Sequence, residues 1–293
     1  MKILAKIGAA FLTIGLVMGV IGSLNSVLKP TEIVAGRPRI IRNHDKVYQL
    51  DEFRSINIDT KNLDVDIVDG SRYEVKVISN RTNSGVNVTE KNGELTVQQT
   101  SRHDFGNFGF ALAAHRESKI VITVPTVDKE LTEINYQSNN ADLFLDGLKV
   151  RQIDFAAANS DLDLLDTEVS GSVKVQMNNG DLDVQNSRLN AATLALRNGS
   201  LKLVDGEVHN LGAELNNGDF EAHATKFTGK NKISNQNGDN ELSGADKTLG
   251  YRLRNKYGDN MLFGAESGQI MSHKWTGENQ IELVTYNGDN TVE

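Results

Sequence analysis

A four-residue phrase that returns along the second half of the chain constrains the fold more than any other feature of the sequence. Its clearest copy is Asn179-Gly180-Asp181-Leu182, and its third position falls at residues 142, 161, 181, 200, 219, 239, 259 and 289. The steps between these positions are therefore 19, 20, 19, 19, 20, 20 and 30 residues. A fixed period of about 20 residues is typical of a chain that stacks one structural coil on the next.

Apolar residues occupy fixed places relative to this phrase. Six residues before its third position stand Tyr136, Phe155, Val175, Leu194, Ala213, Ile233, Leu253 and Leu283, and three residues after it stand Leu145, Leu164, Val184, Leu203, Ala222, Leu242, Leu262 and Val292. Side chains between these places alternate, which indicates strands with one buried face. Each repeat therefore predicts a strand, an Asn-Gly corner and a second strand, in parallel coils stacked at roughly 4.8 Å. A looser apolar column predicts another short strand that closes the coil; its members are Val150, Val169, Leu189, Val208 and Phe227.

The corner residues fit this interpretation because Asn and Gly tolerate positive φ. The pairs expected to form these turns include Asn179 with Gly180, Asn217 with Gly218, Asn237 with Gly238 and Asn287 with Gly288. Asn-Gly also favours tight hairpins, so a meander of antiparallel hairpins is the competing interpretation. The solenoid is preferred because like residues fall in register between coils, as parallel stacking requires.

Two inward columns change from apolar to polar toward the C-terminus. One passes from Leu143, Leu162, Leu182, Leu201 and Phe220 to Asn240, Asn260 and Asn290, and the other from Met177, Leu196 and Leu215 to Asn235, Asn255 and Thr285. We expect the buried amides to bond one another in a ladder along the core. A polar pocket near the C-terminal end is the alternative.

The first 28 residues predict a membrane element. Lys2 and Lys6 precede an uncharged run of 22 residues from Ile7 to Leu28, which is long enough to span a bilayer. An uncleaved single-pass anchor is preferred over a cleaved secretory signal because no small-x-small site follows the run. The short lysine-bearing N-terminus and the absence of cysteine favour an extracytoplasmic position for the rest of the chain. Five basic residues that follow the span within residues 29–46 argue for the opposite orientation.

Three regions follow the membrane element. Residues 29–47 form a basic linker, which is either a solvated tether or a contact with anionic head groups or wall polymer. Residues 48–136 are β-rich without the tight repeat, and we expect them to cap the solenoid repeats of residues 137–293. Two candidate partner contacts are Phe108, in a Gly-spaced apolar loop, and Trp275, in an insertion of about ten residues before the last repeat. The alternative is that each side chain covers an end of the core.

Several motifs together carry a family resemblance. Phe53-x-x-Ile56-x-Ile58, the Val124-Pro125 pair that closes a strand and the serial Asn-Gly-Asp-Leu-Asp-Val coils resemble the bacterial "putative adhesin" domain family of unknown function, found in LiaG-like and YvlB-like envelope proteins. The resemblance covers about residues 48 to 293. It implies an all-β fold, a single-stranded right-handed parallel β-helix, often membrane-anchored and sometimes associated with envelope stress systems. It brings no active site to carry over.

The aspartates in the third position are expected to form an outward column, with neighbours one coil apart. They are Asp142, Asp161, Asp181, Asp219, Asp239, Asp259 and Asp289, and Ser200 interrupts them. Carboxylates this close repel one another unless they bond amides or share a cation. We expect each to bond the backbone of its own turn. Calcium is the alternative, although the calcium-binding glycine-rich nonapeptide repeat has a different phrase.

The sequence predicts no catalytic residue and no cofactor. Asp-x-Asp pairs at 64/66, 161/163 and 181/183 are explained by solvated outer faces, and the six histidines are dispersed without a metal or nucleophile motif. A net charge of −8 makes nucleic acid an improbable partner. We therefore expect a non-enzymatic, membrane-anchored envelope protein that binds or scaffolds, with wall polymer or another envelope protein as its partner. The alternatives are a polysaccharide-active β-helix enzyme and a regulatory partner of a membrane sensor.

Overall fold

The computed structural model describes residues 31–34, 37–40, 44–79, 84–100, 118–125 and 129–293. Every regular element in these ranges is a β-strand, so the all-β prediction is confirmed. The predicted membrane run, Ile7 to Leu28, and the predicted contact Phe108 lie outside the described residues. Within the described part of the chain, no helix has the length and apolar character needed to cross a bilayer.

The described residues fall into two compact units. The smaller contains the antiparallel pair β1 (Thr31–Val34) and β2 (Arg37–Ile40), which lies within the predicted basic linker. The larger contains β3 to β28 in two sheets of 13 strands each. All features below belong to the larger unit.

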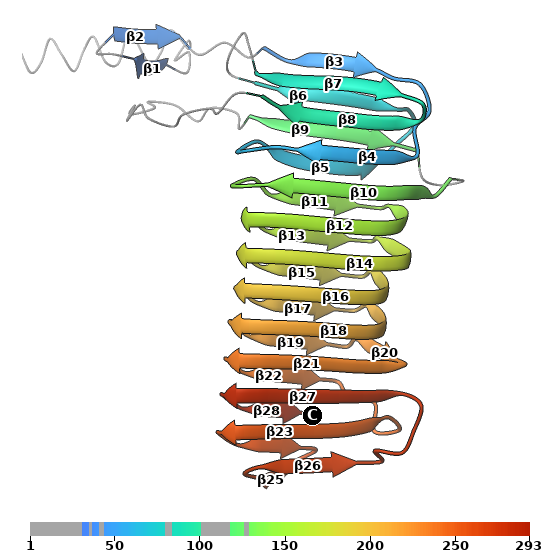
Figure 1. Cartoon of the computed structure of the whole chain (residues 1–293), viewed down its shortest axis with the longest axis vertical. Coiled ribbons are helices and arrows are strands. Elements are labelled where there is room, and N and C mark those ends of the chain that lie inside the picture. Colours follow the sequence, from blue (N-terminus) through green and yellow to red (C-terminus); the bar gives the residue numbers. More distant parts are fainter. Residues whose placement is uncertain (1–30, 35–36, 41–43, 80–83, 101–117, 126–128) are drawn as a thin grey trace, which may run out of the picture. The chain divides into compact units, whose positions relative to one another are not determined.

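The two sheets of the larger unit differ in strand length (Figure 1). The long-strand sheet contains, in order, β26 (Ile270–His273), β23 (Gly250–Tyr257), β27 (Gln280–Asn287), β21 (Lys230–Asn237), β18 (Glu207–Asn217), β16 (Arg188–Asn198), β14 (Glu168–Asn179), β12 (Lys149–Asn159), β10 (Leu131–Ser138), β4 (Ser55–Asp59), β8 (Glu94–Gln99) and β7 (Val86–Lys91), with β20 (Lys226–Thr228) beside β18. The short-strand sheet contains β25 (Ala265–Ser267), β24 (Asn260–Leu262), β28 (Asn290–Val292), β22 (Asn240–Ser243), β19 (Phe220–His223), β17 (Leu201–Val204), β15 (Leu182–Gln185), β13 (Leu162–Leu165), β11 (Leu143–Asp146), β5 (Asp64–Asp69), β9 (Lys119–Val124), β6 (Glu74–Ile78) and β3 (Lys46–Gln49).

Each repeat of the sequence forms one coil, with one strand in each sheet and the Asn-Gly corner between them. Neighbouring coils pair in parallel, so Tyr136 lies beside Phe155 and Phe155 beside Val175. Every member of the two predicted apolar columns is buried. The rings of Tyr136 and Phe155 stack with their centroids 5.1 Å apart. One continuous core therefore runs between the sheets, because no single coil buries its own inner face.

The predicted third strand of each coil is wrong for most coils. The column that includes Val150 and Leu189 is buried, but its residues begin the long strand, and only β20 is separate. The chain bends inside the long strand at single residues with a left-handed backbone, Ala191 at φ 47° and Asn210 at φ 56°. The ladder of hydrogen bonds resumes on both sides of the bend, so the two segments form one strand.

At the C-terminal end, the order of the coils departs from the order of the chain. The last long strand, β27, lies between β21 and β23 and pairs in parallel with both, and β28 lies likewise between β22 and β24. The coil of β23 and β24 therefore lies one level farther along the stack than chain order predicts. The last coil of the chain, β27 and β28, lies between it and the coil of β21 and β22 (Figure 1). The predicted column that contains Leu253 and Leu283 is correct here, because these residues are Cα partners. The predicted order of the two coils is wrong, because all coils share one register and either would fit at either level.

Antiparallel strands close both ends of the stack. At the C-terminal end, β26 pairs antiparallel with β23 and β25 with β24, and these strands are the predicted insertion. At the other end, β8 and β9 form a coil beside β4 and β5, with antiparallel β7 and β6 outside it and β3 beyond β6. A parallel coil therefore ends the described stack at neither side, which limits end-to-end pairing between molecules.

Candidate binding face

The Asn-Gly corners place one row of exposed asparagines along the stack, here called the corner Asn row. The Nδ2 group of Asn159 donates to Asn140 Oδ1 at 2.7 Å, and that of Asn179 to Asn159 Oδ1 at 2.6 Å. The row continues in the same way through Asn198, Asn217, Asn237 and Asn287. The positive φ falls on the glycine alone, 133° at Gly180, where an added Cβ would lie 2.0 Å from the Ser160 carbonyl oxygen. The Asn179-Gly180 corner therefore needs glycine for both its backbone angle and its close packing, whereas the first two corners of the row carry Ala141 and Ser160 without a positive φ.

The aspartates of the third position form a second exposed row beside the first. The Oδ1 atom of Asp161 accepts from the backbone N–H of Asp181 at 2.8 Å, and Asp181 accepts from Ser200 N–H at 2.7 Å. Asp142, Asp219, Asp239 and Asp289 bond in the same way to the next coil, and Asp259 ends the row. The predicted bond to the same turn is wrong, because the next coil's amide lies directly in line with the carboxylate. Among the described residues, no group of three or more His, Asp or Glu side chains is placed to hold a metal ion; calcium at this row remains a prediction.

Asp163, which is half-buried, and Asp183, which is exposed, lie two residues after the third-position aspartates and are Cα partners on β13 and β15. Burial raises the pKa of Asp163, and the charges of Asp183, Asp161 and Asp142 raise it further. Burial likewise raises the pKa of Asp183, although Lys202 opposes this effect. Both pKa shifts have the same direction, whereas acid–base catalysis requires two groups whose environments move their pKa values apart.

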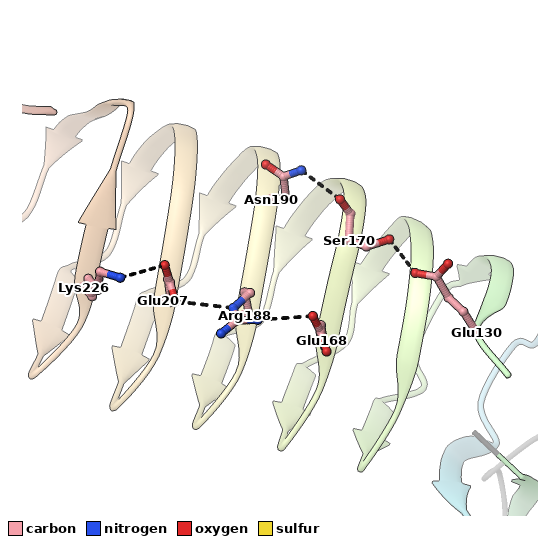
Figure 2. Close-up of polar contacts among 7 residues, drawn as sticks. All are labelled: Glu130, Glu168, Ser170, Arg188, Asn190, Glu207 and Lys226. Carbon is pink, nitrogen blue, oxygen red and sulfur yellow. Dashed lines mark hydrogen bonds and ion pairs between the residues drawn. The ribbon is translucent and has the colours of Figure 1, made fainter. Parts of the chain in front are cut away.

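A row of alternating charges lies at the first residues of β14, β16, β18 and β20, at the ends of these strands away from the Asn-Gly corners (Figure 2). Arg188 lies 3.2 Å from Glu168 and 3.4 Å from Glu207, and Lys226 Nζ lies 3.1 Å from Glu207. The hydrogen bond from Lys226 lowers the pKa of the Glu207 carboxyl. Parallel stacking would otherwise bring like charges together, so the alternation favours this register. A hollow of about 400 Å³ beside the row is lined by these mutually paired groups. Figure 2 also shows the bonds that join Glu130, Ser170 and Asn190.

The outer face of the long-strand sheet carries a groove beside the corner Asn row, here called the alanine groove. It has a volume of about 630 Å³ and crosses β12, β14, β16 and β18. The bottom of the groove is formed by outward-facing alanines, whose side chains extend only to Cβ; they are Ala156, Ala158 and Ala195. Taller, exposed side chains stand beside them: Gln176, Asn178, Arg197, Glu214 and Asn216. The groove is open and mixed in chemistry, with amides that both donate and accept hydrogen bonds.

Two exposed tyrosines lie near the C-terminal end of the same face. Tyr257 is 57% exposed and Tyr286 is 42% exposed, and their ring centroids are 5.3 Å apart. Lys256 Nζ lies 2.7 Å from the Tyr286 hydroxyl oxygen and 4.2 Å from the ring centroid. The hydrogen bond from Lys256 lowers the pKa of Tyr286. Nothing in the sequence pattern predicted this pair, since the two residues are 29 positions apart in the chain and meet only because β27 lies beside β23.

Trp275, a predicted partner contact, lies half-buried between β26 and β27. The Arg252 guanidinium carbon lies 4.2 Å from its ring centroid, and its carbonyl oxygen accepts from Gln280 Nε2 at 3.2 Å. The ring thus packs on Arg252 of the C-terminal coil, and contact of Trp275 with a partner stays a prediction.

The polar core near the C-terminal end is a hydrogen-bonded ladder in one of its two columns. Asn240 Nδ2 donates to Asn290 Oδ1 and Asn290 Nδ2 to Asn260 Oδ1, both at 2.7 Å, so the amide ladder is confirmed for this column. In the other column the prediction is wrong, because Asn235 and Thr285 donate instead to the carbonyl oxygens of corner glycines. Those carbonyls lie nearer than the next side chain along the stack.

Comparison with known proteins adds a family and a fold. The model of the family described as Toastrack DUF4097 matches residues 53–293. A solved structure described as a "putative adhesin" from Bacteroides fragilis is similar over 86% of this chain and 96% of its own length, with a TM-score of 0.50 and 17% identity. A second, from Parabacteroides distasonis, is similar over 86% and 97%, with a TM-score of 0.48 and 12% identity. No curated protein matches the chain.

Proposed function

The chain belongs to the Toastrack DUF4097 family, and on this premise we propose that it is a non-enzymatic binding module of the bacterial cell envelope. Residues 7–28 anchor it in the membrane, and the stacked coils face outward to bind wall polymer or another envelope component. The adhesin description of the Bacteroides fragilis structure supports this proposal through the shared fold.

The observation that carries the proposal is the repeated outer face. Antiparallel strands close both ends of the stack, so contact with a long partner falls to the side of the molecule. That side offers an open groove with amides, one arginine and one glutamate. Open, shallow surfaces suit extended partners, whereas a small-molecule site encloses most of its ligand.

The chemistry of the face supports binding over catalysis. Glu214 is the one carboxylate among the residues that line the groove, whereas Asp161 bonds a backbone amide and Asp163 and Asp183 lie on the short-strand sheet. Hydrolysis of a glycosidic bond needs two carboxyl groups with different roles and environments. The polysaccharide-active alternative would therefore need a site of another kind.

Co-sedimentation of the purified, detergent-solubilised chain with isolated cell-wall sacculi tests the proposal. We expect the chain to pellet with the sacculi in a saturable manner and to release no soluble sugar from them. Release of sugar fragments would establish the enzyme alternative. A chain that stays in the supernatant at every sacculus concentration would contradict wall binding.

A further inference from the structure

We infer that the outer strip formed by the alanine groove and the exposed tyrosine pair is a binding site for an extended, neutral polysaccharide strand that runs parallel to the solenoid axis. This inference rests on the proposed function and specifies its ligand class and its site.

The first argument is the continuity of the strip. The residues directly before and after Asn216, Gln236 and Tyr286 are Cα partners on consecutive coils. These three residues therefore lie in one outer column. The same column includes Asn178 and Arg197, which stand beside the groove. Coils are spaced by about 4.8 Å, so the tyrosines begin about 10 Å beyond the last coil of the groove. One straight ligand can therefore touch both the groove and the tyrosines.

The second argument is the hydrogen-bonding chemistry of the strip. A sugar hydroxyl both donates and accepts, and so does a carboxamide, whereas a carboxylate only accepts. The strip repeats carboxamides at Gln176, Asn178, Asn216 and Gln236. The corner Asn row, one residue away, directs its amides along the stack and holds the corner geometry fixed. The strip thus offers hydroxyl partners at the coil period, which is close to the length of one sugar ring in an extended chain.

The third argument is the tyrosine pair. Tyr257 and Tyr286 are two of the four exposed large apolar side chains in the described part of the chain, and they are the two that touch each other. Tyrosine combines an apolar ring face with a polar tip, which suits a pyranose with C–H groups on its faces and hydroxyls on its rim. Lys256 fixes the Tyr286 hydroxyl through its hydrogen bond. The two rings would therefore provide an aromatic surface, beyond the end of the groove, on which a sugar ring can stack.

The fourth argument is charge. Arg197 and Glu214 at the groove have opposite charges, and Arg254 in the neighbouring outer column is 3.8 Å from Glu282. Lys256, at the tyrosine pair, is a single further cation, whereas an anionic polymer requires a row of cations. A neutral polysaccharide satisfies this balance best.

The test is native affinity electrophoresis of the full chain in detergent, in gels that contain glycol chitin, hydroxyethyl cellulose or dextran, with alginate as the anionic comparison. We expect at least one neutral polymer to retard the chain, and alginate to retard it less. Tyr286→Ala should weaken the interaction about tenfold, as expected for the loss of one aromatic stacking contact. Ala195→Tyr should weaken it similarly by filling the groove with a side chain that points to solvent. Val47→Ala removes a comparably exposed apolar side chain from β3, in the other sheet at the other end of the stack, and should leave mobility unchanged.

The outcomes separate this inference from the proposed function. Circular dichroism melting of each variant establishes that the fold is retained before mobility is compared. If the wild-type chain pellets with sacculi but no neutral polymer retards it, or if both strip variants behave as the wild type, the strip assignment is overturned and wall binding stands. If the chain neither pellets with sacculi nor is retarded by any polymer, both fail. Stronger retardation by alginate than by every neutral polymer also overturns the assignment.

Discussion

The amide ladder in the C-terminal core predicts that two substitutions of the same kind will have different costs. Asn290 lies in the middle of the ladder, where its Oδ1 accepts from Asn240 and its Nδ2 donates to Asn260. Asn240 lies at the end, next to Phe220, and its own Oδ1 is buried without a partner in the described structure. Leucine has the same branching as asparagine, and this column holds leucine in earlier coils, such as Leu201.

The magnitudes follow from counting the groups that each change leaves unpaired. Asn290→Leu leaves Asn260 Oδ1 without its partner and leaves Asn240 Nδ2 with only the Val284 carbonyl oxygen at 3.4 Å, at roughly 1–3 kcal/mol for each lost bond. Burial of the leucine returns roughly 2 kcal/mol, so the net loss should be about 2 kcal/mol. Asn240→Leu strands the Asn290 oxygen but removes an oxygen that was already unpaired, so these effects cancel. With the leucine added, Asn240→Leu should be neutral or stabilising by up to about 2 kcal/mol.

Urea unfolding followed by the fluorescence of Trp275 measures this difference. Trp275 is the chain's only tryptophan, and it packs on Arg252 in the coil that contains Asn260, so it reports on the coils that carry the ladder. Stability of a stacked array is partly local, which makes a local probe more informative than a global one. If Asn290→Leu proved as stable as Asn240→Leu or more so, the ladder would not be the source of stability in this core.

Three other predictions follow from the corners, Asp163 and the coil order. Gly180→Ala should cost roughly 3 kcal/mol or more in urea unfolding, because it strains a φ of 133° and drives a Cβ into a neighbouring carbonyl; an unchanged midpoint would exclude the tight corner. The folded state raises the pKa of Asp163, so its ionisation destabilises the fold above the pKa of the unfolded chain, about 3.9. Asp163→Asn should therefore stabilise the protein at pH 7, and the difference in unfolding midpoint should shrink as the pH falls toward 4; a difference independent of pH would refute the shift. In this cysteine-free chain, the pair Ser234→Cys with Val284→Cys should form a disulfide on mild oxidation, whereas Ser234→Cys with Arg254→Cys, two coils apart, should not; the reverse pattern on a non-reducing gel would mean that the coils stack in chain order.

The sequence predicts the coil and its core because every coil repeats the same constraint. The apolar columns through Tyr136 and Leu145 specify which faces are buried, and the corner glycines specify where the chain turns. The corner asparagines were identified from spacing alone, although their bonding along the stack, rather than a backbone angle, explains them. Local pattern and global fold agree at these positions, which is why a single sequence suffices.

The features that the sequence does not predict depend on which coil lies beside which. A coil with the shared register fits at any level, so the step of 30 residues before the last repeat indicates an insertion but not that β27 lies between β21 and β23. The tyrosine pair depends on that insertion, and the aspartate row bonds to a neighbouring coil instead of its own turn. The alanine groove arises from small residues on two different strands, β12 and β16, which are not neighbours in the chain.

Labelling of intact cells tests the envelope placement most directly. The chain contains no cysteine, so a single Gly268→Cys substitution creates a unique thiol at an exposed site where an added Cβ meets no atom within 4 Å. A membrane-impermeant maleimide should label this variant in intact cells to the same extent as in lysed cells, and the cysteine-free wild type provides the blank. Labelling that appears only after lysis would place the stacked coils in the cytoplasm and contradict an envelope-binding role.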